Sequence, residues 1–206
     1  MSKKLKILVA GKYIKKKIDG ISIYTFLKEK GHNVYCCNEF EKIKFNKKYD
    51  LIISYGYGLI FNKNDIIKLS TKIINLHIGY LPFARGIYPI LWSLIYKKPI
   101  GITFHTIENN TIDGGRIIFK KKITYSAKES LKEIHQNCIR HINQNFILKF
   151  NKIYDFNSNH KKVVGTHYFN RKKSKKLLFS LPKKWDTKAS FLKNNSIKFK
   201  KIYKSK

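Results

Sequence analysis

A chain of 206 residues, of which 43% are hydrophobic, is long enough for one domain with a real core and a small appendage. Its three cysteines, two of them adjacent at positions 36 and 37, do not make a disulfide framework or a metal site. The net charge of +32 would suit nucleic acid or an anionic membrane surface, but only four of the 44 basic residues are arginine.

The spread of the lysines bears on that charge. They run along the whole chain beside many Ile and Asn residues, which indicates a general bias of the organism's proteins toward Lys, Ile and Asn. The positive charge would then help to bind anionic substrates only as a secondary effect. Arginine is the residue that favours bidentate phosphate contacts and base readout. The N-terminus is not a signal peptide, and no uncharged apolar run reaches the roughly 18–20 residues needed to cross a bilayer. We therefore expect a soluble cytoplasmic protein without a membrane partner, and nucleic acid remains only an alternative.

Short apolar runs alternate with segments of helical spacing, which predicts a three-layer α/β protein with a mostly parallel central sheet. The predicted strands are Lys6–Ala10, Val34–Cys37, Leu51–Ser54, Ile73–Leu76, Gly101–Ile107 and Ile117–Ile123. The predicted helices are Ile21–Lys30, Asp65–Leu69, Ile90–Tyr96 and a long helix from Ser126 to about Lys152, where Ser126 and Glu129 form a capping box.

Glycines follow two of these strands. The first strand ends at Gly11 without a G-x-G-x-x-G or Walker loop, so a dinucleotide or ATP site is not supported. The third strand runs into the sequence Tyr-Gly-Tyr-Gly at 55–58, where glycines let the backbone approach a flat ligand. A β-turn with aromatic packing is the alternative for this segment.

Three polar residues stand where a purely structural segment would not need them. Asn75 and His77 end the fourth strand and point to the same side, and Asp113 precedes the pair Gly114–Gly115 in a loop. An amide and an imidazole that converge can stabilise an oxyanion and take a proton, and a carboxylate can orient the imidazole. This predicts acyl transfer in which the attacking group belongs to a substrate. On spacing alone, a local turn or a satisfied histidine remains an alternative.

Several linked motifs extend this pattern in order. They are Asn75–Leu76–His77, Leu81–Pro82, Arg85–Gly86, Pro89, Gly101–Ile102–Thr103–Phe104–His105 and Ile112–Asp113–Gly114–Gly115. Together they resemble the folate-dependent formyltransferases, most closely the nucleotide-sugar N-formyltransferases, over roughly residues 5–150. The resemblance implies a Rossmann-like formyltransferase core and a catalytic triad of Asn75, His77 and Asp113. It implies N10-formyltetrahydrofolate as co-substrate and no metal.

The resemblance also assigns binding residues. It implies a pterin pocket formed largely by backbone groups, and the expected folate contacts are Tyr57, Leu59, Ile60, Asn109 and Ile112. The expected contacts to the sugar nucleotide are Tyr80, Arg85 and Trp92. The implied acceptor is the amine of a nucleotide-linked amino-deoxy sugar, above all a dTDP-4-amino-4,6-dideoxyhexose of the kind used in lipopolysaccharide O-antigen synthesis. Family analogy further suggests a homodimer.

The end of the chain has a different character. We expect residues 1–155 to form the catalytic domain and 156–206 a short C-terminal β-hairpin with a basic tail that frays from Asn194. The polar stretch 157–162 reads as a linker, and the segments 165–168 and 185–187 resemble elements of the sugar N-formyltransferases.

Three other functions remain open. They are a methionyl-tRNA formyltransferase-like enzyme, a formyltetrahydrofolate hydrolase, and a non-catalytic basic nucleic-acid-binding protein on the same fold. We expect the roughly 50 residues after the long helix to be too few for the tRNA-binding barrel of the first kind, and we do not expect the regulatory domain of the second.

Overall fold

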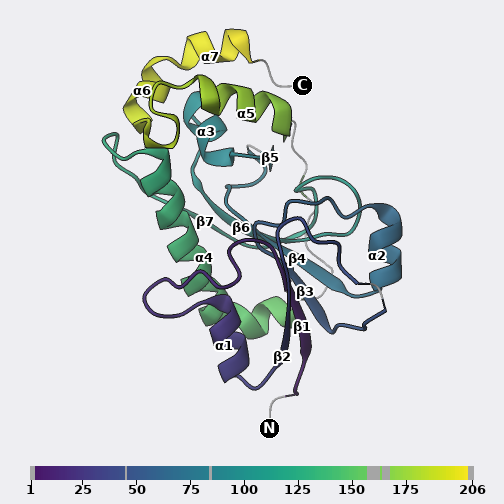
Figure 1. Ribbon diagram of the computed structural model, residues 1–206. Coiled ribbons are helices and arrows are strands. Elements are labelled where there is room, and N and C mark those ends of the chain that lie inside the picture. The colour runs from purple at the N-terminus through teal and green to yellow at the C-terminus, as the bar shows by residue number, and fades with distance from the viewer. Residues whose placement is uncertain (1–2, 45, 84, 157–162, 164–167, 204–206) are drawn as a thin grey trace. The chain divides into compact units, whose positions relative to one another are not determined.

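The computed structural model describes residues 3–44, 46–83, 85–156, 163 and 168–203, and Figure 1 shows the arrangement of its elements. The strands are β1 Lys6–Ala10, β2 Asn33–Cys37, β3 Leu51–Ser54, β4 Lys72–His77, β5 Arg85–Gly86, β6 Gly101–Thr106, β7 Ile117–Lys122 and β8 Tyr168–Phe169. The helices are α1 Ile23–Glu29, α2 Lys63–Leu69, α3 Pro89–Ile95, α4 Leu131–Tyr154, α5 Arg171–Ser180, α6 Ala189–Asn194 and α7 Ser196–Ile202, with a 3₁₀ turn, η1, at Lys184–Asp186.

The main sheet follows the order β2-β1-β3-β4-β6-β7, and β5 pairs with β8 in a second, two-stranded sheet. Strands β2, β1, β3 and β4 are parallel to their neighbours. In β3 every residue is buried, and in β1 only Lys6 is exposed, which is the burial expected of central parallel strands covered on both faces. The predicted Rossmann-like α/β core is confirmed.

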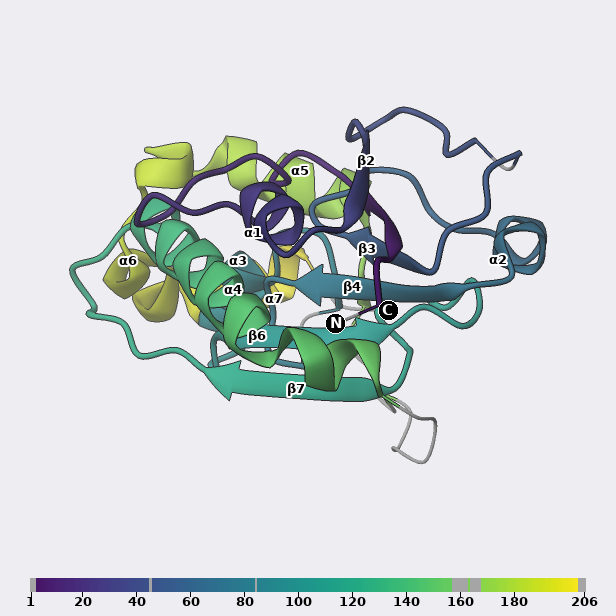
Figure 2. The same ribbon diagram turned by 90° about the horizontal axis from the view of Figure 1, so that it is seen from below.

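The direction of the sheet reverses at β6. Figure 2 shows the arrows of β4 and β6 pointing in opposite directions, and the Ile107 amide donates to the Ile73 carbonyl over 2.8 Å. Strand β7 reverses again, because Thr106 N donates to Arg116 O and Ile123 N donates to Ile100 O, both over 2.9 Å. The sheet is therefore mixed.

The chain folds as two compact units. Unit 1 comprises residues 1–77, 104–119 and 142–162, and unit 2 comprises 78–103, 120–141 and 163–206. The predicted division into a catalytic domain, residues 1–155, and a C-terminal segment, residues 156–206, stays a prediction.

Unit 1 has helices on both faces of its strands. On one face Phe26 of α1 lies edge-on to Phe146 and Phe150 in the second half of α4, with ring centroids 6.3 and 5.8 Å apart. On the other face Leu69, at the end of α2, packs in a cluster that contains Leu8 of β1. Figure 1 shows α2 on the side of these strands opposite to α1. The result is the expected three-layer arrangement.

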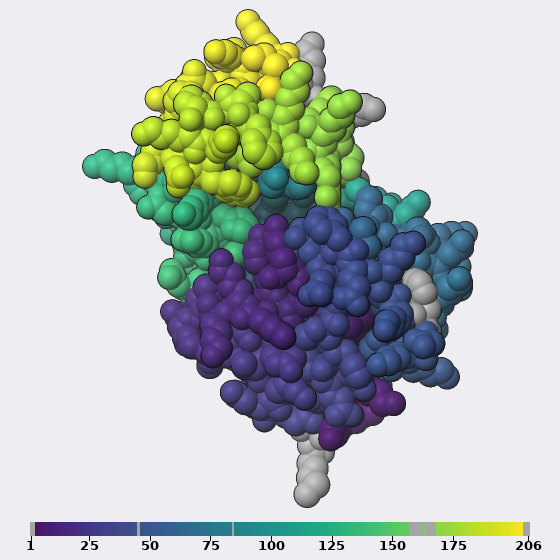
Figure 3. Space-filling view, viewed as in Figure 1, coloured from purple at the N-terminus to yellow at the C-terminus, as the bar shows by residue number. Residues whose placement is uncertain are grey.

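Unit 2 is built around Trp92 of α3. Its side chain is 0% exposed, its indole N–H donates to Ser174 Oγ over 2.8 Å, and it stacks on Phe169 with centroids 4.0 Å apart. Helices α6 and α7 contact α3. Figure 3 shows α5, α6 and α7, in yellow-green and yellow, gathered as one group of side chains.

The C-terminal expectation needs correction. Within 168–203 the chain forms α5, η1, α6 and α7, and the short strand β8 pairs with β5 in parallel, so a β-hairpin is wrong for these residues. The physical reason is amphipathic spacing, since Leu177 and Leu178 of α5 and Phe199 of α7 are buried on one side of short lysine-rich helices. For the same reason the expected fraying from Asn194 is wrong up to Ile202. The segment 165–167 and the linker 157–162 lie outside the described residues.

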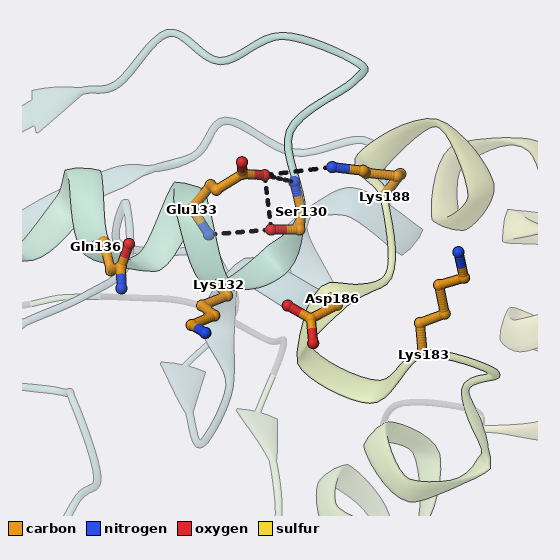
Figure 4. Close-up of a pocket in the computed structure, with 7 residues that line it drawn as sticks. All are labelled: Ser130, Lys132, Glu133, Gln136, Lys183, Asp186 and Lys188. Atoms are coloured by element: carbon orange, nitrogen blue, oxygen red, sulfur yellow. Dashed lines mark hydrogen bonds and ion pairs between the residues drawn. The ribbon is translucent and has the colours of Figure 1, made fainter.

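Helix α4 begins later than predicted. Ser126 and Glu129 do bond to each other, but they close a turn, and the cap of the helix is the next Ser-x-x-Glu pair, Ser130 and Glu133 (Figure 4). The Glu133 carboxylate accepts from Ser130 N and Oγ over 2.6 and 2.7 Å, and Glu133 N donates back over 3.2 Å. Backbone pairing of Ser130 with Lys188 draws the preceding residues out of the helix.

A candidate active site on strands β4 and β6

Asn75 and His77 lie two residues apart on β4 and so point to the same side. Asn75 is half-buried, and His77, the last residue of the strand, is 7% exposed. Because β6 runs opposite to β4 and Ile107 pairs with Ile73, His105 falls directly opposite Asn75. This pairing brings a second imidazole into the site.

Asp113 lies in the loop between β6 and β7. The loop is closed at its base, where Arg116 N donates to Thr106 Oγ1 over 2.8 Å and the Arg116 guanidinium donates to Glu108 over 2.6 Å. A Cβ at Gly115 would lie 1.7 Å from Thr106 O, so only glycine allows this close approach. Asp113 has φ of +48°, a left-handed conformation that aspartate tolerates better than most residues.

One carboxylate oxygen of Asp113 lies close to the polar groups of the other three side chains. Oδ1 accepts from Asn75 Nδ2 over 3.2 Å and lies 3.5 Å from His77 Nδ1 and 3.4 Å from His105 Nε2. The side chains of Asp113, His77 and His105 are only 8%, 7% and 1% exposed. The three predicted catalytic residues therefore meet, together with His105, in one cluster within unit 1, which we call the Asp113 cluster.

His105 is the member of the Asp113 cluster that sequence reasoning missed. It stands in the motif Gly101–His105, where it could be read as one more strand residue. Strand periodicity puts His105 on the same face as Thr103. It predicts a place beside Asn75 only when the antiparallel pairing of β4 with β6 is known.

The Asp113 cluster combines an amide donor, two imidazoles and a carboxylate. If His77 Nδ1 carries its hydrogen toward Asp113, then His77 Nε2 is the nitrogen that can take a proton. A carboxylate at this distance favours the charged imidazolium that results. The arrangement can thus serve as a general base beside a hydrogen-bond donor.

The expected folate residues after β3 belong to unit 1 and differ in how far they are buried. The Tyr57 hydroxyl donates to Glu41 O over 2.8 Å, its ring packs near Phe61, and burial raises its pKa to about 12. Leu59 is half-buried and Ile60 is 63% exposed. The Tyr57 side chain is thus engaged in packing, and a folate contact through the backbone of this segment stays a prediction.

Two further expected folate residues belong to the loop of Asp113. Asn109 is exposed, and its Oδ1 accepts from Thr111 N over 2.8 Å, so it shapes the turn that leads to Asp113. Ile112 is half-buried immediately before Asp113.

The three expected sugar-nucleotide residues belong to unit 2. Tyr80 is half-buried, and Lys120 Nζ lies 4.7 Å from the centre of its ring. Arg85 is half-buried in β5. Trp92 as a ligand contact is wrong, because its whole side chain, including the indole N–H, is used in the core of unit 2.

No helix within the described parts of the chain combines the length and apolar character that crossing a membrane requires.

Comparison with known proteins gives matches over the same region. A family model described as formyl transferase matches residues 15–150. The chain is 33% identical over 105 residues to a methionyl-tRNA formyltransferase of Alkaliphilus oremlandii, which covers 50% of this chain and 33% of that protein. It is 26% identical over 100 residues to a dTDP-4-amino-4,6-dideoxyglucose formyltransferase of Mycobacterium tuberculosis, covering 48% of this chain and 42% of that one. It thus spans about a third to two fifths of the length of these curated relatives.

One solved structure is similar along almost its whole length. It is the formyltransferase PseJ from Anoxybacillus kamchatkensis, in complex with UDP-4,6-dideoxy-4-formamido-L-AltNAc and tetrahydrofolate. The two are 28% identical with a TM-score of 0.77, over 91% of this chain and 97% of that one.

Proposed function

Because the chain belongs to the formyl transferase family, we propose that it moves a formyl group from N10-formyltetrahydrofolate to the amine of a nucleotide-linked 4-amino-4,6-dideoxyhexose. The observation that carries the choice of acceptor is the likeness to PseJ, which extends over nearly the full length of both chains. A methionyl-tRNA formyltransferase is 33% identical to this chain over 105 residues, so methionyl-tRNA is the alternative acceptor.

The residues of the Asp113 cluster fit a reaction between two external substrates. An amide, two imidazoles and a carboxylate offer a donor, a base and a negative charge, and the nucleophile is the amine of the acceptor. N10-formyltetrahydrofolate supplies the formyl carbon as a substrate. The residues of the 55–61 and 109–112 segments are proposed to hold its pterin, and Tyr80 and Arg85 to contact the sugar nucleotide.

The proposed reaction is a displacement at the formyl carbon. The acceptor amine attacks the formyl carbon, and the new C–N bond places negative charge on the formyl oxygen. Asn75 Nδ2 donates to this oxyanion. His77 takes a proton from the amine nitrogen, and Asp113 stabilises the imidazolium. The oxyanion then re-forms the carbonyl as the bond from the carbon to N10 breaks, N10 receives the proton held on His77, and the products are the N-formylated sugar and tetrahydrofolate.

The test is an acceptor panel. N10-formyltetrahydrofolate is incubated with dTDP-linked and UDP-linked 4-amino-4,6-dideoxyhexoses, their 3-amino isomers and methionyl-tRNA, and each product is weighed for a gain of one formyl group. We expect a 4-amino sugar nucleotide to react fastest, and His77→Ala and Asn75→Ala to lower turnover by about 10²-fold or more. If methionyl-tRNA is formylated faster than every sugar nucleotide, the acceptor is a tRNA and not a sugar. Near-normal turnover by either variant would contradict the roles proposed for His77 and Asn75.

A further inference from the structure

His105 is buried and makes directed contacts with its ring nitrogens. Its side chain is 1% exposed. Nδ1 lies 2.9 Å from the Thr106 backbone oxygen, and Nε2 lies 3.2 Å from Asn75 Nδ2 and 3.4 Å from Asp113 Oδ1. Its ring is T-shaped to that of His77, with centroids 6.0 Å apart.

The Thr106 contact determines which nitrogen of His105 carries the hydrogen. A backbone carbonyl can only accept, so the 2.9 Å contact requires that Nδ1 donates. In the neutral imidazole, Nε2 then bears a lone pair and can only accept. Two groups face Nε2, and of these the Asn75 amide nitrogen at 3.2 Å can donate to it, whereas the Asp113 oxygen at 3.4 Å cannot.

The orientation of the Asn75 amide follows from the same argument on its other side. The Asp113 carboxylate accepts, so the Asn75 atom 3.2 Å from Oδ1 is the amide nitrogen. An amide nitrogen has two hydrogens, and the cluster offers two acceptors, Asp113 Oδ1 and His105 Nε2. In the free protein the three side chains thus satisfy one another, and the hydrogen that Asn75 gives to His105 Nε2 is the one that turns to the oxyanion when it forms.

We infer that His105 is a positioning residue that keeps the amide nitrogen of Asn75 turned into the Asp113 cluster. An asparagine amide can rotate by half a turn and exchange its nitrogen for its oxygen at little steric cost. The rotated amide would present an oxygen to the oxyanion and repel it. With His105 Nε2 and Asp113 Oδ1 both accepting, the rotated form would set oxygen against two acceptors. The inference rests on the proposed function for its kinetic consequence.

Nuclear magnetic resonance reads the arrangement directly in the wild-type chain, whether or not any acceptor is turned over. Long-range ¹H–¹⁵N spectra of the imidazoles should show His105 neutral with its hydrogen on Nδ1, and a coupling across the hydrogen bond should join His105 Nε2 to Asn75 Nδ2. A His105 with its hydrogen on Nε2 would overturn the inference. A failure of formyl transfer in the acceptor panel would leave this spectrum unchanged and would count against the proposed function alone.

Variants then test the kinetic consequence. His105→Leu removes the acceptor and should lower kcat by about 10- to 100-fold with little change in KM, the scale expected when a reacting group is misplaced. His105→Gln offers an acceptor oxygen near the position of Nε2 and should recover most of that rate. His32→Leu is the matched control, because His32 is also buried in unit 1 and accepts from Leu5 N over 3.4 Å. It should lower stability without changing kcat.

A double-mutant cycle shows whether His105 acts through Asn75. In an Asn75→Ala background, His105→Leu should cause no further loss of rate, because the amide that it positions is absent. An equal, additional loss in that background would overturn the inference, as would a His105→Leu variant that keeps the wild-type kcat.

Discussion

Replacing Asp113 by asparagine separates the charge of this residue from its shape. Asparagine is nearly the same size, tolerates the left-handed φ of +48° and can still accept through its oxygen. We therefore expect folding to be preserved, with a stability change of about 1 kcal/mol or less. The rate should fall, because the imidazolium that is proposed to form on His77 loses the negative charge beside it.

The geometry gives the size of this loss. His77 Nδ1 lies 3.5 Å from Asp113 Oδ1. Two unit charges at that distance attract by about 5 kcal/mol at an effective dielectric constant of about 20. At about 1.4 kcal/mol for each factor of ten, the loss corresponds to a fall in kcat of about 10³-fold.

The assay is single-turnover formyl transfer at saturating co-substrate and acceptor, run beside thermal melts. Asp19→Asn is the matched control, since Asp19 also has a left-handed φ, of +52°, and lies outside the Asp113 cluster. Position 114 is glycine, and an Asn–Gly sequence can deamidate to a carboxylate, so fresh protein is verified by mass. An Asp113→Asn variant that melts earlier but reacts at the wild-type rate would make Asp113 a turn residue and refute the electrostatic argument.

The remaining predictions concern packing, the loop and pH. Trp92→Ala should lower the free energy of unfolding by about 3–5 kcal/mol in denaturant titrations, and a loss no larger than that of the half-buried Trp185→Ala would contradict its core role. Gly115→Ala should lower kcat by about 10²-fold, because its Cβ would displace the loop of Asp113 from Thr106 O; kinetics at the wild-type level would show that the loop adapts. Hydrogen bonds from Ser130 hold the pKa of Glu133 at about 2 against an ordinary 4.5. Because the folded pKa is depressed, this stabilisation is complete above about pH 4.5 and is lost as the pH falls from there toward 2. Melting temperatures of Glu133→Gln should accordingly depend less on pH in that window, and parallel profiles for variant and wild type would show that Glu133 contributes nothing there.

The parts of the fold that could be predicted are those dominated by burial. The strands Lys6–Ala10 and Leu51–Ser54 match their predicted bounds, because an apolar run of this length has few other ways to bury itself. The meeting of Asn75, His77 and Asp113 could also be predicted, since strand periodicity fixes the first two and the linked motifs pointed to the third.

The parts that could not be predicted depend on partners distant in the chain. Helix α4 has two capping boxes in sequence, and only the pairing of Ser130 with Lys188 selects the second. Trp92 is expected from the sequence to contact the sugar nucleotide from a predicted helix, and its burial is explained only by Phe169 and Ser174, which lie far along the chain and pack around it. His105 enters the site only because β6 runs antiparallel to β4.

The path of the chain through the two units has a consequence for how acceptor choice can diverge. Unit 1 ends its first segment at His77 and resumes at Phe104. Residues 78–103 are therefore an excursion from unit 1 that starts directly after His77 and ends two residues before His105. The groups of the cluster lie outside the excursion, whereas Tyr80 and Arg85 lie inside it. If Tyr80 and Arg85 contact the acceptor as proposed, substitutions, insertions or grafts within 78–103 should alter which acceptor is formylated without changing any residue of the Asp113 cluster.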